Sequence, residues 1–356
     1  MDISTIGLDL AKNVFQIHAI NATGEVVVRK MLRRTQLLAF FAKLPPCLVG
    51  AEACGTSHHW ARELMKLGHE VRLMPPVYVK PYVKRGKNDA ADAEAICEAV
   101  TRQTMRFVPV KSREQQAALS LHRARSLLIR QRTQLVNLMR SMLAELGIAI
   151  PVGLEKALQM ARQIVDQEID LDLPAEAAGV VTMLSGQILQ LHVQLRKLDL
   201  RLARLQRSDE MARRLATIPG VGPVGATALA ASVTDPGQFA SGRQFAAWLG
   251  LTPRQNSSGG KERLGRITKM GDKYLRQLLV IGATSLVRRA KDKPEAVDPR
   301  FIALLARKPA RVATIAMANK IARIAWAVMA RGDVFRPGHV PVLAAGGVAT
   351  GRHIVA

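Results

Sequence analysis

The sequence has few cysteines, few acidic residues and no long apolar run. Its three cysteines, Cys47, Cys54 and Cys97, form neither the even set of a disulfide framework nor the spacing of a zinc site. We therefore expect buried thiols in a reducing cytoplasm. No uninterrupted run of about 20 apolar residues is present, so we expect no membrane-spanning helix. The first residues lack the basic and apolar regions of a signal peptide, and we expect none.

Acidic side chains are the scarcer charged class. The 356 residues include 28 Asp and Glu against 52 Lys and Arg, a formal net charge of +24. Residues 211–356 hold 23 basic and 7 acidic side chains, and so carry +16 of that total. Solubility alone does not require so local an excess. Because a strongly basic surface attracts polyanions, we expect nucleic acid as the partner and the last segment as its main binding surface.

Four of the scarce acids occupy positions that suggest a metal site. Asp89 and Asp92 lie three residues apart behind Asn88, a good N-cap residue, so they should share one face of a helix. Asp9 and Glu52 each end or adjoin an apolar, strand-like run. Acids also favour the first turn of any helix, which is the purely structural alternative. If the four carboxylates converge, they form a site for hard cations such as Mg²⁺, with Mn²⁺ as a possible substitute.

The first hundred residues read as a mixed α/β domain. Strand patterns cover 3–9, 14–20, 26–28, 47–51 and 70–74, and helix patterns cover 36–44, 57–67 and the segment from Asp89. Three strands followed by alternating helices and strands is the order of the ribonuclease-H fold. In that fold the first strand is central and the fourth lies beside it. We therefore expect Asp9 and Glu52 to be neighbours, with the last helix packed across them.

The middle third reads as helical. Residues 112–146 keep one apolar face between arginines. A second series steps alternately by four and three residues: Leu184, Ile188, Leu191, Leu195, Leu198, Leu202 and Leu205. Such a heptad pattern predicts a helical hairpin or a coiled coil. An intramolecular hairpin with the first helix and dimerisation are both compatible with it.

The last third combines glycine turns with basic side chains. Pro219-Gly220-Val221-Gly222 separates two helical stretches and resembles a helix-hairpin-helix element, in which glycines let backbone amides approach a phosphate. A plain helical turn is the alternative. A polar loop at 254–261 contains Ser257 and Ser258. Seven basic side chains in or after this loop are predicted to bind nucleic acid, together with Gly220 and Gly222: Arg254, Lys261, Arg263, Arg266, Lys269, Lys273 and Arg276.

These patterns predict four parts. They are an α/β domain at 1–105, a helical hairpin or coiled-coil region at 106–210, a mainly α domain with the helix-hairpin-helix element and the serine loop at 211–336, and a disordered tail at 337–356. Further helices are expected at 272–290 and 310–331. From the residues alone, the serine loop reads as a phosphate clamp, since a serine hydroxyl is a poor nucleophile without an activating base or metal.

Five motifs in order resemble the DEDD transposases of bacterial insertion sequences, relatives of the Piv DNA invertase. The resemblance covers about residues 3–335. The motifs are Gly-Leu-Asp9-Leu-Ala-Lys, Ala-Glu52-Ala-Cys-Gly-Thr, Lys-Asn-Asp89-Ala-Ala-Asp92-Ala, Ile-Pro-Gly-Val-Gly, and Leu-Gly-Leu-Thr-Pro-Arg-Gln-Asn-Ser-Ser258-Gly followed by Ile-Thr-Lys-Met-Gly. One departure is Cys54, where relatives often have threonine.

The resemblance implies a RuvC-like, ribonuclease-H-like N-terminal domain and a C-terminal domain with a nucleophilic serine. By this resemblance, Asp9, Glu52, Asp89 and Asp92 bind Mg²⁺, and Ser258 attacks the scissile phosphate to give a phosphoserine intermediate. Ser257 is the neighbouring alternative. The family also implies a homo-oligomer, a dimer or tetramer, an element-encoded guide RNA, and action on DNA in the bacterial cytoplasm in association with the nucleoid.

Two other functions stay open at this stage. One is a metal-only RuvC-like endonuclease for Holliday junctions, in which the serine loop only grips phosphates. The other is a structural nucleic-acid-binding protein without catalytic activity, built from a coiled coil and a hairpin element. Substitution of Ser258 separates the first of these from a recombinase, and substitution of Asp92 separates both enzymes from a binding protein.

Overall fold

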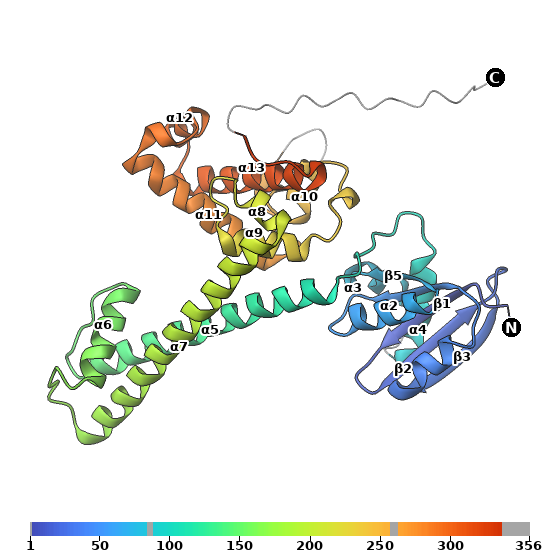
Figure 1. The fold of residues 1–356 in the computed structure, drawn as a ribbon, viewed down its shortest axis with the longest axis horizontal. Coiled ribbons are helices and arrows are strands. Elements are labelled where there is room, and N and C mark those ends of the chain that lie inside the picture. Colours follow the sequence, from blue (N-terminus) through green and yellow to red (C-terminus); the bar gives the residue numbers. More distant parts are fainter. Residues whose placement is uncertain (1, 84–87, 257–262, 337–356) are drawn as a thin grey trace. The chain divides into compact units, whose positions relative to one another are not determined.

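The computed structural model describes residues 2–83, 88–256 and 263–336 (Figure 1). The chain divides into two compact units. Unit 1 runs to Leu195 and includes Ala230–Asp235, and unit 2 comprises Arg196–Leu229 and the chain from Pro236 onward. The tail predicted at 337–356 lies outside the described residues. The predicted division into four parts stays a prediction.

Unit 1 contains a five-stranded mixed sheet. Its strands are β1 (Thr5–Leu10), β2 (Val14–Ile20), β3 (Val26–Arg33), β4 (Leu48–Glu52) and β5 (Glu70–Met74). The order is β3-β2-β1-β4-β5; β1, β2 and β3 pair antiparallel, whereas β4 pairs parallel with β1 and β5 parallel with β4. The meander and the place of β4 beside a central β1 are therefore confirmed. Strand β3 extends beyond the predicted segment because residues up to Arg33 pair with β2.

Helices cover both faces of this sheet. They are α1 (Leu37–Phe41), α2 (Ser57–Lys66), α3 (Pro76–Val79) and α4 (Asp89–Val100), with 3-10 turns η1 (Arg34–Gln36) and η2 (Lys80–Tyr82). Ile6 and Leu8 of β1 are buried in one core cluster with Phe41 of α1 and Leu64 of α2. Since side chains alternate along a strand, Gly7 and Asp9 point to the opposite face, where α4 packs. Burial of each such aliphatic or aromatic side chain contributes about 1.5–3 kcal/mol.

Two glycines let α4 lie directly on the sheet. Gly7 and Gly50 pair in the parallel register of β1 and β4. A Cβ atom on Gly7 would lie 2.1 Å from the carbonyl oxygen of Ala93, and one on Gly50 would lie 2.7 Å from Cβ of Val100. Both distances are too short for a side chain. The glycine pair therefore sets how closely α4 approaches the two strands that end in Asp9 and Glu52.

The rest of unit 1 is helical. It contains α5 (Arg113–Glu145), α6 (Leu154–Val165) and the first part of α7 (Ala175–Ser208). Leu184 and Ile188 of α7, the first two heptad positions, are buried in a cluster with Met139 of α5 and Leu158 of α6. The helices α5, α6 and α7 therefore pack together within unit 1, and the choice between a hairpin and a dimeric coiled coil stays a prediction. Helix α6 was not predicted, because Pro151 and Gly153 mark a break and the chain becomes helical again directly after them.

Unit 2 is mainly helical, as predicted. Besides the second part of α7 and most of α9 (Pro223–Ser232), its elements are α8 (Glu210–Leu215), η3 (Pro236–Gln238), α10 (Gly242–Trp248), β6 (Pro253–Gln255), β7 (Leu264–Ile267), α11 (Lys273–Asp292), η4 (Pro294–Ala296), α12 (Pro299–Arg307) and α13 (Ala310–Arg331). Helix α13 packs against α10 and α11. Helix α13 is long and apolar enough to cross a membrane. Half of its most apolar segment is buried inside the protein, as in the core helix of a globular domain.

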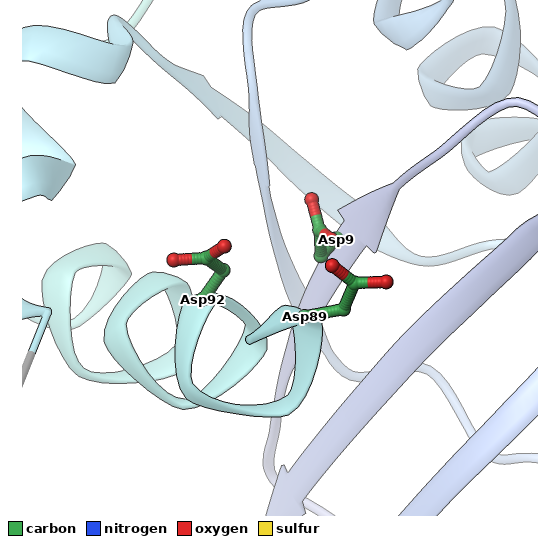
Figure 2. A group of neighbouring side chains, drawn as sticks. All are labelled: Asp9, Asp89 and Asp92. Carbon is green, nitrogen blue, oxygen red and sulfur yellow. The ribbon is translucent and has the colours of Figure 1, made fainter. Parts of the chain in front are cut away.

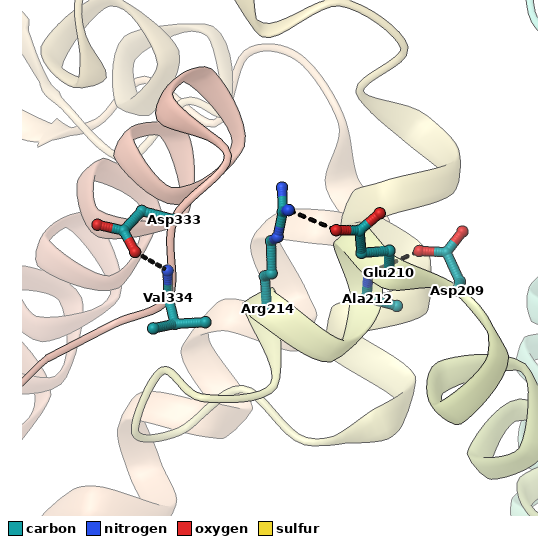
Figure 3. A network of polar contacts seen from close by, with 6 residues as sticks. All are labelled: Asp209, Glu210, Ala212, Arg214, Asp333 and Val334. Carbon is teal, nitrogen blue, oxygen red and sulfur yellow. Dashed lines mark hydrogen bonds and ion pairs between the residues drawn. The ribbon is translucent and has the colours of Figure 1, made fainter.

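Short polar contacts fix the ends of helices in unit 2 (Figure 3). The Asp209 side chain caps α8 by accepting a hydrogen bond from the Ala212 amide at 2.6 Å. Glu210 and Arg214, one turn apart, form an ion pair along α8. Caps of this kind stabilise a helix by about 1 kcal/mol. They anchor the short helix that leads into the Pro219–Gly222 turn.

Candidate active site

Three of the four predicted acids meet at the end of β1 (Figure 2). One carboxylate oxygen from each of Asp9, Asp89 and Asp92 lies within 4.8 Å of the other two. Asp9 is the second-last residue of β1, whereas Asp89 and Asp92 lie in the first turn of α4. That turn is capped by Asn88, whose Oδ1 accepts a hydrogen bond from the Ala91 amide at 2.7 Å. The capped helix start thus presents two carboxylates, one turn apart, beside the strand end.

Glu52 lies at the end of the neighbouring strand. Leu8 pairs with Ala51 in the parallel register, so Asp9 and Glu52 follow at the same level of the sheet. Among the described residues, the group of oxygens within 4.8 Å does not include Glu52. Burial raises the pKa of the Glu52 carboxyl, and the charges of Asp9 and Asp92 raise it further. Glu52 is therefore an electrostatic neighbour of the cluster formed by the other three acids.

Without a bound metal, the ionised carboxylates of the cluster lower the stability of the fold. Partial burial, then the charge of Asp89 and then that of Asp92, raise the pKa of Asp9 to about 6, and a hydrogen bond from the Leu10 backbone partly offsets this. Like charges in a partly desolvated place oppose ionisation. A divalent cation would relieve the repulsion, and carboxylate oxygens are the ligands that Mg²⁺ and Mn²⁺ prefer. The donor set of this site therefore fits a hard divalent cation.

Asp9→Asn is expected to stabilise the metal-free protein. For a folded pKa near 6 against 3.8 in the unfolded chain, linkage gives about 3 kcal/mol, and screening of the partly exposed carboxyl reduces this to about 1–2 kcal/mol. The ionised carboxylate destabilises the fold at any pH above 6, so the gain is fully present there. It disappears as the pH falls towards 4, where the native carboxyl is protonated. Chemical denaturation of the metal-free protein across this range measures it.

Asp166→Asn is the matched control, because Asp166 is an exposed carboxylate after α6 and far along the chain from the cluster. It should leave the free energy of unfolding within about 0.5 kcal/mol at every pH. Equal stabilisation by both substitutions, or a gain for Asp9→Asn that grows below pH 4, would contradict repulsion at the cluster.

Gly7 and Gly50 belong to the site although sequence reasoning missed them. Each stands two residues before an acid, in Gly7-Leu8-Asp9 and in Gly50-Ala51-Glu52. Since residues two apart share one face of a strand, the same face carries the glycine on which α4 rests and the acid beside the start of α4. The matched spacing at the ends of two apolar runs is the signal that would have found them.

The predicted serine loop falls mainly outside the described residues, which end at Asn256 and resume at Arg263. Ser257, Ser258 and Lys261 are therefore not placed. Arg254 and Gln255, which were predicted as part of this loop, belong to strand β6, which pairs antiparallel with β7, and the Asn256 amide donates to the Arg263 carbonyl at 2.9 Å. Arg254, Arg263 and Arg266 lie exposed on this hairpin.

The remaining basic residues differ in their surroundings. Lys269 and Lys273 are exposed. Arg276 is half-buried, and its Nη1 donates to the carbonyl oxygens of Leu249 at 2.9 Å and Met270 at 2.8 Å. Arg276 therefore braces the chain between α10 and α11, a structural task that its place in a basic series did not reveal.

The glycine turn joins α8 and α9. Gly220 has a φ of +85° and packs against α11, where a Cβ on Gly282 would lie 1.9 Å from the Gly220 carbonyl oxygen. Gly222 is exposed immediately before α9. Close packing on α11 explains Gly220 without a ligand, so the assignment of the turn as a phosphate-binding helix-hairpin-helix element stays a prediction.

Known protein families and proteins match this chain along nearly its whole length. The family model described as "Transposase IS116/IS110/IS902 family" matches residues 212–297, and a second model, described as "Transposase" and built on the DEDD proteins of IS110, matches residues 6–148. The second match contains all four predicted acids.

Several full-length relatives are similar. A protein of Pseudomonas aeruginosa named "Probable family 20 transposase" is 49% identical over 95% of this chain and 100% of its own length. The "Transposase for insertion sequence element IS1328" of Yersinia enterocolitica is 40% identical over 94% of this chain and 99% of its own. The "Transposase for insertion sequence element IS1111A" of Coxiella burnetii is 38% identical over 95% and 92%, respectively.

Proposed function

The chain belongs to the IS116/IS110/IS902 family of insertion-sequence transposases, and from this premise we propose that it cuts and rejoins DNA with a carboxylate metal site. The observation that carries the proposal is the meeting of Asp9, Asp89 and Asp92 within 4.8 Å at the end of β1. These acids come from segments far apart in the sequence, and a bound divalent cation would offset the repulsion between them. The strand order of unit 1 supports a ribonuclease-H-like, RuvC-like domain around them.

Asp9, Asp89 and Asp92 would hold Mg²⁺, or Mn²⁺ in its place, with Glu52 completing the set. A divalent ion bound there would stabilise the negative charge that develops on the phosphate oxygens and on the departing oxygen. The carboxylates orient the scissile phosphate by fixing the cation site on the rigid end of β1 and the capped start of α4. Because the pKa of Asp9 is raised to about 6, protons compete with a cation for its oxygens at mildly acidic pH, and the pKa of Glu52 is raised as well.

We assign the nucleophile to Ser258, with Ser257 as the alternative. In this step the serine Oγ forms an ester bond to phosphorus, the bond from phosphorus to one sugar oxygen breaks, and the proton of the serine hydroxyl ends on that sugar oxygen. Reversal with a different sugar hydroxyl rejoins the strand. The exposed arginines of the β6–β7 hairpin, which flanks the serines, support binding of the phosphate backbone.

Removal of divalent metal is expected to abolish DNA cleavage. The test incubates the protein with DNA that carries the two ends of the element, in Mg²⁺, in Mn²⁺ or in EDTA, and measures nicked and joined strands on denaturing gels. Products in Mg²⁺ and Mn²⁺ and their absence in EDTA are the expected result. Equal cleavage in EDTA would rule out the carboxylate metal site.

Binding of the DNA backbone predicts a steep dependence on salt. With contacts to about six phosphates, the logarithm of the affinity should fall with the logarithm of the salt concentration with a slope of about −5. Replacing Arg254, Arg263 and Arg266 by alanine should make that slope shallower by about 3, since each phosphate contact contributes about 0.9. Fluorescence anisotropy of labelled duplex DNA in increasing NaCl measures it.

The matched control removes three exposed cations of unit 1, Lys43, Lys66 and Arg102, and should leave the slope nearly unchanged. Equal changes in both triple variants would show that only net charge matters and would refute a hairpin that contacts phosphates. A slope near zero in the unmodified protein would refute the electrostatic account as a whole.

The remaining assignments follow from the family alone. We propose a homo-oligomer, an element-encoded guide RNA as a partner, and action in the bacterial cytoplasm on nucleoid DNA. The basic surface of residues 211–356 is compatible with RNA as well as DNA. Heptad positions beyond Ile188 include Leu191 and Leu198, which are only partly buried and are therefore candidates for contact with a second copy.

A further inference from the structure

Beside the acid cluster lies a groove of about 320 Å³ between the β2–β3 hairpin and the first turns of α4. Its lining combines polar and apolar groups and includes Gln16, His18, Arg29, Met31, Asn88 and Glu94. Every one of these residues belongs to unit 1, and none of them is among the four predicted metal ligands. The groove is a feature that the transposase assignment alone does not explain.

Two walls of the groove adjoin the acid cluster. Gln16 is the cross-strand partner of Asp9, and Met31 is the partner of Gln16 on the next strand. Because directly paired residues share one face of a sheet, Asp9, Gln16 and Met31 form a row that crosses three strands, at spacings of about 5 Å. The opposite wall begins at Asn88, the residue before Asp89. A chain whose phosphate lies at the cluster would therefore place its neighbouring unit in the groove.

The side chains of the groove match the parts of a nucleotide. Met31 is 63% exposed and offers an apolar thioether surface to the face of a base. Gln16 and Asn88 carry amides that can donate to and accept from a base edge. The Arg29 side chain is 65% exposed and lies 3.9 Å from a Glu94 oxygen, at the limit of an ion pair, so its charge remains accessible to a phosphate.

We propose that this groove receives the nucleotide next to the scissile phosphate, with Met31 against the base and Arg29 on the following phosphate. The proposal rests on the proposed function, since it takes the acid cluster as the place of the scissile phosphate. It adds a base-contacting site to the α/β domain, whereas the bulk of the positive charge lies in the other unit.

Photocrosslinking tests the proposal without any need for cleavage. The probe is a short single-stranded thymidine oligonucleotide with one 4-thiothymidine, irradiated with the full-length protein and digested for mass spectrometry. We expect a crosslinked peptide that contains Met31 or Gln16. In the double variant Arg29→Ala, Met31→Ala the yield of this peptide should fall about tenfold, because the variant lacks both the thioether contact to the base and the cation for the phosphate. Both side chains are exposed, so the fold should survive, and circular dichroism checks this.

Lys43→Ala is the matched control, because it removes one exposed positive charge outside the groove, and it should leave the yield unchanged. Crosslinks confined to peptides of unit 2, or equal yields in the double variant and the unmodified protein, would overturn the proposal. An RNA probe of the same length tests whether the bound nucleotide belongs to DNA or to RNA. Crosslinking of the groove by the RNA probe and not by the DNA probe would overturn its assignment to the DNA strand that is cut. Failure to cleave DNA, with the groove crosslink retained, would count against the proposed function and not against the groove.

Discussion

Asp92→Asn is expected to lower the rate of DNA cleavage by about three orders of magnitude or more while DNA binding persists. The substitution keeps the size of the side chain but removes one negative charge from the cluster with Asp9 and Asp89. A weakened or displaced cation loses most of the charge stabilisation at the phosphorus, and each factor of ten corresponds to about 1.4 kcal/mol of the barrier. Single-turnover cleavage of end DNA in Mg²⁺, with binding measured in parallel, gives both quantities.

Glu98→Gln is the control for this change, because Glu98 lies on the same helix and pairs with Arg102 at 2.7 Å on the surface. It should cleave at the rate of the unmodified protein within a factor of about two. Loss of cleavage by Asp92→Asn with binding retained would exclude a purely structural nucleic-acid-binding protein. Unchanged cleavage would remove Asp92 from the metal site and with it the proposed role of the capped start of α4.

Ser258→Ala is expected to abolish joined products, with a loss of about three orders of magnitude or more. Removal of the attacking oxygen leaves only binding and charge stabilisation, and loss of a nucleophile in enzymes of this kind costs such factors. Joined and nicked strands are measured with end DNA and Mg²⁺. Ser257→Ala is the matched control and should retain most of the joined product.

The pattern of products distinguishes the two enzyme hypotheses. Loss of both nicked and joined strands in Ser258→Ala supports a serine recombinase. Metal-dependent nicking that survives in Ser258→Ala would contradict this and favour a metal-only endonuclease, in which the serine loop binds phosphates. Loss in Ser257→Ala in place of Ser258→Ala would move the nucleophile by one residue, a register that the doubled serine leaves open in the sequence.

The α/β unit was the most predictable part of the fold. Apolar and alternating patterns end close to the observed strands, and β2 and β5 occupy the predicted residues. Asn88 as a cap located the start of α4 within one residue, because its side chain satisfies an amide that the helix cannot. The early part of β3 could be predicted, but its extension could not, since pairing with β2 and not local preference keeps residues up to Arg33 in a strand.

Some elements of the two helical regions were not predicted because their local sequence patterns are weak. Helix α6 follows a Pro and Gly pair that reads as the end of a helix, and α10 and α12 have fewer than ten residues each, too few for a clear period. The β6–β7 hairpin was not predicted: the residues of β6 from Arg254 on were placed in a polar loop and those of β7 in no element, because both strands are short and largely exposed. Pairing between strands, which no local pattern reveals, makes these residues regular.

In the candidate site, too, features set by local sequence could be predicted, whereas features set by contacts between distant segments could not. Asp89 and Asp92 follow from helix spacing, and their approach to Asp9 follows from strand order once the fold class is assumed. That Glu52 is a neighbour outside the 4.8 Å group depends on side-chain reach, which spacing does not encode. The glycine pair under α4 and the brace formed by Arg276 likewise depend on contacts between distant segments.

The most direct test of the account is the mass of the protein after reaction with DNA. The protein is incubated with Mg²⁺ and junction DNA, denatured, digested with nuclease and protease, and examined by mass spectrometry. The account predicts a nucleotide attached through phosphate to the peptide that contains Ser258, present in the unmodified protein and absent in Ser258→Ala and in EDTA. Cleaved DNA without any attached peptide would contradict it, because strand cutting would then proceed at the carboxylate site with water as the nucleophile.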